Sequence, residues 1–89
     1  MAATRVKLTA DELIRWKIQL DADRPGAADA RLRDSGVPVW ALISYYEAAR
    51  DIDEVARDFE VPTEDVRAAL AYYRSHKAAI DVRLAMNAA

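Results

Sequence analysis

The 89-residue sequence has no cysteine, which excludes disulfides and thiolate metal sites. Its 13 basic and 15 acidic residues leave no positive net charge, which argues against strong non-specific nucleic-acid binding by the whole chain. No apolar run approaches membrane-spanning length, and residues 1–5 lack the apolar core of a secretory signal, so we expect a cytoplasmic protein. A chain of this length forms one domain with a small core, for which self-association or a partner chain is a common source of stability.

The first predicted element is a helix at residues 10–22. Thr9 and Glu12 have the spacing of a capping box, in which each side chain accepts a backbone N–H that the first turn leaves free. Apolar side chains between residues 13 and 20 then follow helical spacing, and Pro25-Gly26 ends the segment.

A short connection separates this helix from the rest of the chain. Residues 30–33 alternate apolar and polar side chains, which favours an extended segment, although the neighbouring alanines also suit a helical turn. Residues 34–36 have the composition Asp-Ser-Gly, which is typical of a turn. We therefore expect an extended segment followed by a turn.

Three amphipathic segments follow, at residues 39–49, 52–59 and 64–86. Each has apolar residues at positions i, i+3, i+4 and i+7, which form one face of a helix. Asp51 and Thr63 are favourable N-cap residues for the second and third segments. Since no glycine or proline interrupts the third segment, we predict it to be one continuous helix.

The order of a short helix, a tight turn and a longer helix indicates a helix-turn-helix pair, to which the preceding helix adds a third side. We predict an all-α fold: a homeodomain-like tri-helical helix-turn-helix core with an extra N-terminal helix and a long C-terminal helix. Ile43, Phe59 and Leu70 are expected at the centre of this core. Residues 1–29 would form the N-terminal helix and linker, and residues 30–89 the helix-turn-helix domain with a partner-binding C-terminal helix.

Two sequence runs point to a family. They are Leu-Arg-Asp-Ser-Gly-Val-Pro-Val-Trp at residues 32–40 and Val-Arg-Ala-Ala-Leu-Ala-Tyr-Tyr at residues 66–73. In this order and spacing they resemble the bacterial family called domain of unknown function 433, over about residues 30–85. Gly36 departs from the family pattern, which often has a basic side chain there, so no role of that side chain carries over.

The resemblance implies a homeodomain-like helical fold and a role as a VapB-type antitoxin of a type II toxin–antitoxin pair. Such an antitoxin neutralises a PIN-like ribonuclease encoded beside it, and binding to its own promoter DNA is a second activity of the class. Two alternatives stay open: a helix-turn-helix DNA-binding regulator that acts without a toxin, and a small dimeric interaction scaffold.

The sequence offers little for catalysis. His76 is the single histidine, and neither a glycine-rich phosphate loop nor a set of metal-ligand residues is present. The acidic pairs near helix starts are explained by capping. We therefore expect neither an enzyme nor a cofactor.

If the chain binds DNA, the second helix of the pair would present its N-terminal residues to the major groove. These residues are Glu64, Asp65, Arg67, Ala68 and Ala71. Arg67 is the candidate for a bidentate guanine contact, whereas the two carboxylates would repel phosphates. The candidates for flanking phosphate contacts are Arg57, Arg74 and Arg50. Alternatively, these arginines form a solvated face that pairs with Asp53, Glu54 and Asp58.

Partner binding is the function we prefer from the sequence. The resemblance implies that the nuclease holds a metal ion in a carboxylate cluster, which an arginine or lysine of the antitoxin can pair with and block. The candidate cations are Arg74, Lys77 and Arg83, with Ile80 and Leu84 as apolar anchors. The alternative is an alanine-rich tail in which Ile80 packs locally on the N-terminal helix.

The aromatic residues exceed what one small core needs. Tyr46 and Tyr73 suit the core, with their hydroxyl groups at its rim. The residues predicted to line a face for homodimer formation are Trp40, Tyr45, Tyr72 and Trp16. We expect a homodimer because the core is small.

Overall fold

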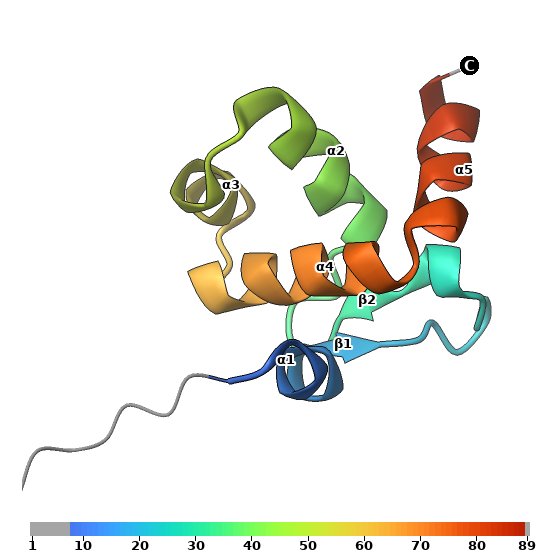
Figure 1. Ribbon diagram of the computed structural model, residues 1–89, viewed down its shortest axis with the longest axis horizontal. Coiled ribbons are helices and arrows are strands. Elements are labelled where there is room, and N and C mark those ends of the chain that lie inside the picture. Colours follow the sequence, from blue (N-terminus) through green and yellow to red (C-terminus); the bar gives the residue numbers. More distant parts are fainter. Residues whose placement is uncertain (1–7, 89) are drawn as a thin grey trace, which may run out of the picture.

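The computed structural model describes residues 8–88, which are mostly helical (Figure 1). In chain order the elements are α1 (Ala10–Lys17), β1 (Ile18–Gln19), the 3-10 helix η1 (Ala27–Asp29), β2 (Arg31–Leu32), α2 (Val39–Ala49), α3 (Ile52–Phe59), α4 (Thr63–Ser75) and α5 (Lys77–Ala88). The predicted all-α class is therefore confirmed, with one two-stranded antiparallel sheet added. The homeodomain-like arrangement of the three central helices stays a prediction.

The core lies where α2, α3 and α4 contact one another. Ile43 is buried at its centre as predicted, whereas Phe59 and Leu70 are only partly buried at its margin. Phe59 is the last residue of its helix, and its ring packs against Tyr45, with 5.5 Å between the ring centres. The fully buried side chains of the three helices are Val39, Leu42, Ile43, Val55, Val66, Ala68 and Ala69.

Two of the three predicted caps are confirmed, whereas the prediction of Thr63 as an N-cap is wrong, because Thr63 is the first residue of α4 and follows Pro62, which has no side chain that can cap the helix. The capping box of Thr9 and Glu12 is present, with both reciprocal hydrogen bonds formed, at 3.2 and 2.9 Å. The Asp51 side chain accepts the backbone N–H groups of residues 53 and 54 at the start of α3. Each capping residue satisfies donors that the first helical turn cannot pair.

The N-terminal helix is shorter than the predicted 10–22, because Ile18 leaves α1 with an extended backbone and pairs with Leu32 across the small sheet. This pairing confirms the extended segment expected at residues 30–33. The Arg33 guanidinium donates to the carbonyl groups of Arg15, Trp16 and Ile18 at 3.1–3.3 Å. A cation that binds the free carbonyls at a helix C-terminus stabilises that end, so Arg33 fixes where α1 stops.

The predicted continuous helix over residues 64–86 is wrong, because α4 and α5 are separate helices that meet at His76. The backbone N–H of His76 donates to the carbonyls of both Tyr72 and Tyr73, and its ring stacks on Tyr72 with 4.1 Å between ring centres. Figure 1 shows α5 turning away from the axis of α4 and rising beside α2. The turn brings Ile80 into the core, where it is fully buried. The burial of Ile80 stabilises this break between α4 and α5, which neither a glycine nor a proline marks in the sequence.

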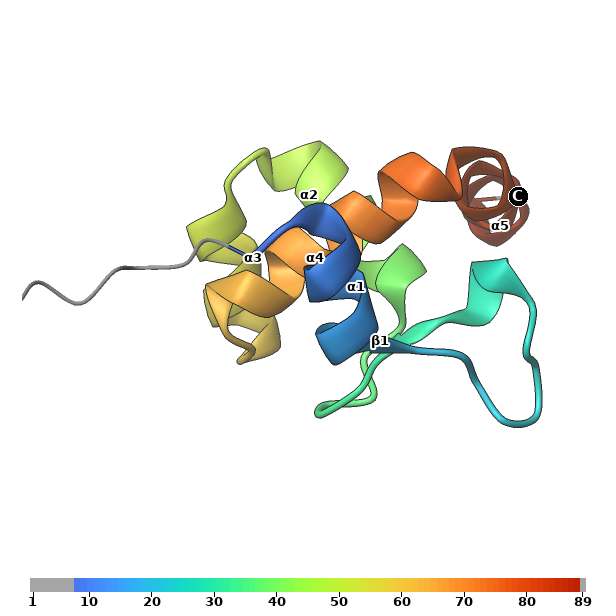
Figure 2. The ribbon, with the colours of Figure 1, turned by 60° about the horizontal axis from the view of Figure 1, so that its bottom comes forward.

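The N-terminal elements belong to the same core as the central helices. Ile18 is buried together with residues of α2, α3 and α4, and α1 packs on α4. Figure 2 shows α1 lying across α4, on the side away from α2. Within residues 8–88, no helix is long and apolar enough to cross a membrane.

Candidate functional site

The face of α4 that would enter a DNA groove is largely covered. Of the predicted groove-facing residues, Asp65, Ala68 and Ala71 are buried. Small side chains allow a neighbouring helix to approach closely, and α1 packs along α4 with Leu13 and Ile14 against the core cluster. The side of α4 that carries these residues is therefore covered by α1.

A charge contact fixes α1 on α4. The ammonium group of Lys17 lies 3.5 Å from a carboxylate oxygen of Asp65 and 3.9 Å from one of Glu64. The Asp65 side chain is 3% exposed, and the oxygen that faces Lys17 accepts no hydrogen bond. Lys17 therefore supplies the charge that compensates this buried carboxylate. Sequence analysis missed this contact because residues 17 and 65 come together only through the tertiary fold.

Two arginine side chains on α4 are exposed to solvent. Arg67 and Arg74 are exposed, and neither forms an ion pair within residues 8–88. Their spacing of seven residues places them on one side of the helix, about 10 Å apart along its axis. We call these two residues the arginine stripe. It can receive an anionic group, either a phosphate or a carboxylate.

The other predicted DNA-contacting arginines lie on or beside α2 and α3. Arg57 is exposed, and Arg50, also exposed, follows α2 in a left-handed conformation with its guanidinium 5.5 Å from the centre of the Tyr46 ring. In the described part of the chain, no ion pair joins the predicted arginines to Asp53, Glu54 or Asp58. Asp58 instead accepts a hydrogen bond from the Tyr45 hydroxyl, which raises the pKa of Tyr45.

Most of the predicted partner-binding residues of α5 serve the fold itself. Ile80 is fully buried and is therefore a core residue rather than a docking anchor. Arg83 forms an ion pair with Asp29 that connects α5 to η1. Lys77 pairs with Asp81, and this hydrogen bond is the main reason why the pKa of Asp81 is lowered.

The predicted dimer residues are dispersed over the structure. Tyr72 is buried, and its hydroxyl donates to the carbonyl of Ala27 at 2.9 Å, so it is not available to a second chain. Burial also raises the pKa of Tyr72. Tyr45 is partly buried beside Phe59, and Trp16 is exposed on α1. Trp40 lies apart from these three residues, at a groove between α2 and α5.

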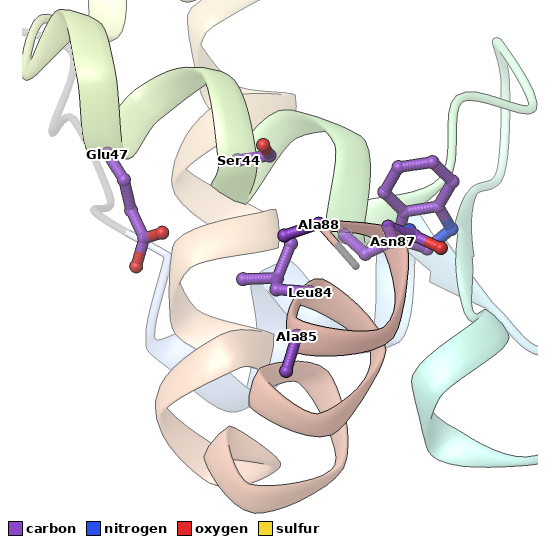
Figure 3. Close-up of a pocket in the computed structure, with 7 residues that line it drawn as sticks. Ser44, Glu47, Leu84, Ala85, Asn87 and Ala88 are labelled. Carbon is purple, nitrogen blue, oxygen red and sulfur yellow. The ribbon is translucent and has the colours of Figure 1, made fainter.

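This groove has a volume of about 390 Å³ and is lined by Trp40, Ser44, Glu47, Leu84, Ala85, Asn87 and Ala88. Figure 3 shows that Ser44 and Glu47 come from α2, and the other labelled residues from the last turns of α5. On another side of α5, two large apolar side chains are exposed, Val82 at 59% and Met86 at 67%. Of the predicted residues, Leu84 and Trp40 are thus brought together at the groove. Sequence analysis missed Val82 and Met86 because the break at His76, which sets the orientation of α5, was not predicted.

The described residues bring together no group of three or more histidine, aspartate or glutamate side chains that could hold a metal ion. The candidate sites are therefore surface features: the arginine stripe on α4, and the groove between α2 and α5. They define a small, mostly helical domain with one basic and one apolar surface.

Comparison with known proteins places this domain in a family. Residues 27–73, more than half of the chain, match the model of a family described as protein of unknown function (DUF433), and the chain belongs to this family. No curated protein and no solved structure matches it. The match begins at η1 and ends inside α4, so α1 and α5 lie outside it.

Proposed function

We propose that this protein is an antitoxin-like binding protein of a type II toxin–antitoxin pair, which neutralises a PIN-like ribonuclease in the cytoplasm. The observation that supports this proposal is the arginine stripe, which is exposed, forms no ion pair among residues 8–88, and lies beside a covered side of α4. A covered face disfavours the docking of α4 into a DNA groove, because the groove needs the whole outward side of the helix. The same arginines suit a protein partner with an acidic site.

Arg74 is the candidate blocking residue. Of the three cations predicted for this role, Lys77 and Arg83 already have carboxylate partners within the chain. A guanidinium group forms two parallel hydrogen bonds with a carboxylate and stays charged at any physiological pH. Inserted among metal-binding carboxylates, Arg74 would occupy the position of the metal ion and stop hydrolysis.

Co-expression of the chain with the nuclease encoded beside it tests the proposal. We expect Arg74→Ala to abolish rescue of growth and to weaken the purified complex by about 10- to 100-fold, since truncating a buried charged anchor costs about 2 kcal/mol or more. Arg74→Lys should retain part of the activity. Arg24→Ala removes an equally exposed arginine from a loop and is the matched control. Full neutralisation by Arg74→Ala would contradict the proposed role.

A DNA-binding regulator is the second candidate, and the exposed position of Arg67 favours it. A gel-shift assay with the chain's own promoter would then show an affinity that falls steeply with salt concentration and is lost in Arg67→Ala. Tight binding of the promoter in the absence of any nuclease would favour this candidate over the antitoxin.

A further inference from the structure

We propose that the partner docked on the arginine stripe presents two separate acidic groups to it, about 10 Å apart along α4. Arg74 pairs with the first group, and Arg67 pairs with the second. This inference rests on the proposed function, because it describes the acidic protein that Arg74 would block. It assigns Arg67 as the residue that selects among such proteins.

The two arginines of the stripe differ from most cations that the structure describes. The cations that form ion pairs within residues 8–88 are Lys17, Arg31, Lys77 and Arg83. Arg67 and Arg74 are exposed, form no such pair, and have no charged residue between them in the sequence. The Glu64 carboxylate, one turn before Arg67, lies 3.9 Å from the ammonium group of Lys17 instead. Both guanidinium charges are therefore available to an acidic partner.

A partner that pairs with Arg74 covers Arg67 as well. A stable protein interface buries about 800 Å² on each side, which corresponds to a patch about 30 Å across. The two arginines lie on the same side of α4, about 10 Å apart along its axis. An interface centred on Arg74 therefore contains both guanidinium groups.

Arg67 must then find an acceptor on the partner. A covered guanidinium loses its hydrating water, which is costly unless a carboxylate or another acceptor replaces that water. Arginine cannot avoid this cost by losing its proton, because it stays charged at physiological pH. Arg67 therefore opposes any partner that places an apolar or basic surface on it, and favours one that places a carboxylate there.

The geometry of the helix favours two acidic groups over one. Side chains seven residues apart leave α4 in nearly the same direction, so the two guanidinium groups stay apart rather than meet at one cluster. The Glu64 side chain, 52% exposed, lies one turn before Arg67 and repels a continuous phosphate backbone. Separate carboxylates on a folded protein surface avoid this repulsion.

Calorimetric titration of the full-length chain with the purified nuclease encoded beside it tests the inference. We expect Arg67→Ala to weaken binding by about tenfold or more, because it removes a charge pair inside the interface, and Arg67→Glu to abolish binding. Arg24→Ala removes an exposed arginine outside α4 and should leave the affinity unchanged. Circular dichroism should show unchanged helix content in Arg67→Ala, since the side chain is exposed and alanine favours a helix.

A double-mutant cycle distinguishes two acidic groups from one. The losses of binding free energy in Arg67→Ala and Arg74→Ala should add, because each arginine has its own acceptor. A double variant that binds no more weakly than Arg74→Ala alone would overturn the inference.

The single variants separate this inference from the proposed function. Unchanged affinity of Arg67→Ala, together with a loss in Arg74→Ala, would overturn the second acidic group and leave the proposed function standing. Unchanged nuclease binding by both variants would overturn the two together. An Arg67→Ala chain that loses its promoter DNA but keeps the nuclease would assign Arg67 to nucleic acid and would also overturn the inference.

Discussion

The contact between Lys17 and Asp65 gives the sharpest test of how α1 is held. Replacing Lys17 with methionine keeps the apolar part of the side chain but removes the charge that faces the Asp65 carboxylate. The Asp65 side chain is only 3% exposed. Breaking a buried ion pair from one side costs about 3–5 kcal/mol, because the remaining charge is left without compensation. The Lys17 side chain is 23% exposed and water partly screens it, so we expect a loss of about 2 kcal/mol.

Thermal and urea unfolding measure this loss. For a chain of this size, about 2 kcal/mol lowers the melting temperature by roughly 8–16 °C. A double-mutant cycle isolates the charge contact: in an Asp65→Ala background, Lys17→Met should cost less than about 0.5 kcal/mol. Lys77→Met is the matched control, since it removes a lysine from the exposed pair with Asp81 and should cost far less. An equal loss from Lys17→Met in both backgrounds would refute the reasoning.

Three further predictions concern the connections around α1 and η1. Arg33→Ala removes the cation that binds the last carbonyls of α1, so amide exchange in α1 should accelerate more than in α3; equal protection would contradict the capping role. Tyr72→Phe loses the hydrogen bond to the carbonyl group of Ala27 and should lower the free energy of unfolding in urea by about 1 kcal/mol, with an unchanged m-value. A hydrogen bond from Arg31 lowers the pKa of Asp21 below 3.8, so its contribution to stability is present above that pH and is lost as the pH falls through the folded-state pKa. Asp21→Asn should therefore flatten the acid limb of a plot of melting temperature against pH.

Local signals predicted the starts of α1 and α3 and the central helices, but they misplaced the cap of α4 by one residue. A capping side chain acts within four residues of its own position, so Thr9 and Asp51 could be identified without any tertiary information. The bounds of α2 follow from apolar spacing, and those of α3 from apolar spacing together with the Asp51 cap.

The ends and breaks of helices depended on distant contacts. The end of α1 is set by Arg33 and by the pairing of Ile18 with Leu32, both more than ten residues away. The break at His76 is stabilised by the burial of Ile80 in a core to which other elements contribute. Neither position has a glycine or proline, and no local pattern distinguishes them from a continuing helix.

The exposure of the candidate site residues could likewise be predicted where it depends on local sequence, and not where it depends on distant contacts. The exposure of Arg67 and Arg74 followed from their positions on a helix, whose apolar face was visible in the sequence. The burial of Asp65 did not, because an acidic residue in the first turn of a helix is normally solvated and stabilised by the helix dipole. Its burial requires α1 above it, and the sequence gives no sign of where α1 packs.

The position of the family match separates the core from what flanks it. Residues 27–73 contain η1, the second strand, α2, α3 and all but the last two residues of α4, whereas α1 and α5 lie outside. Yet these two flanking helices decide which surfaces are open: α1 covers the side of α4 that carries Asp65, and α5 forms the groove with α2. The segment that matches the family therefore does not by itself determine which surfaces of the chain are open, since both flanking helices lie outside it.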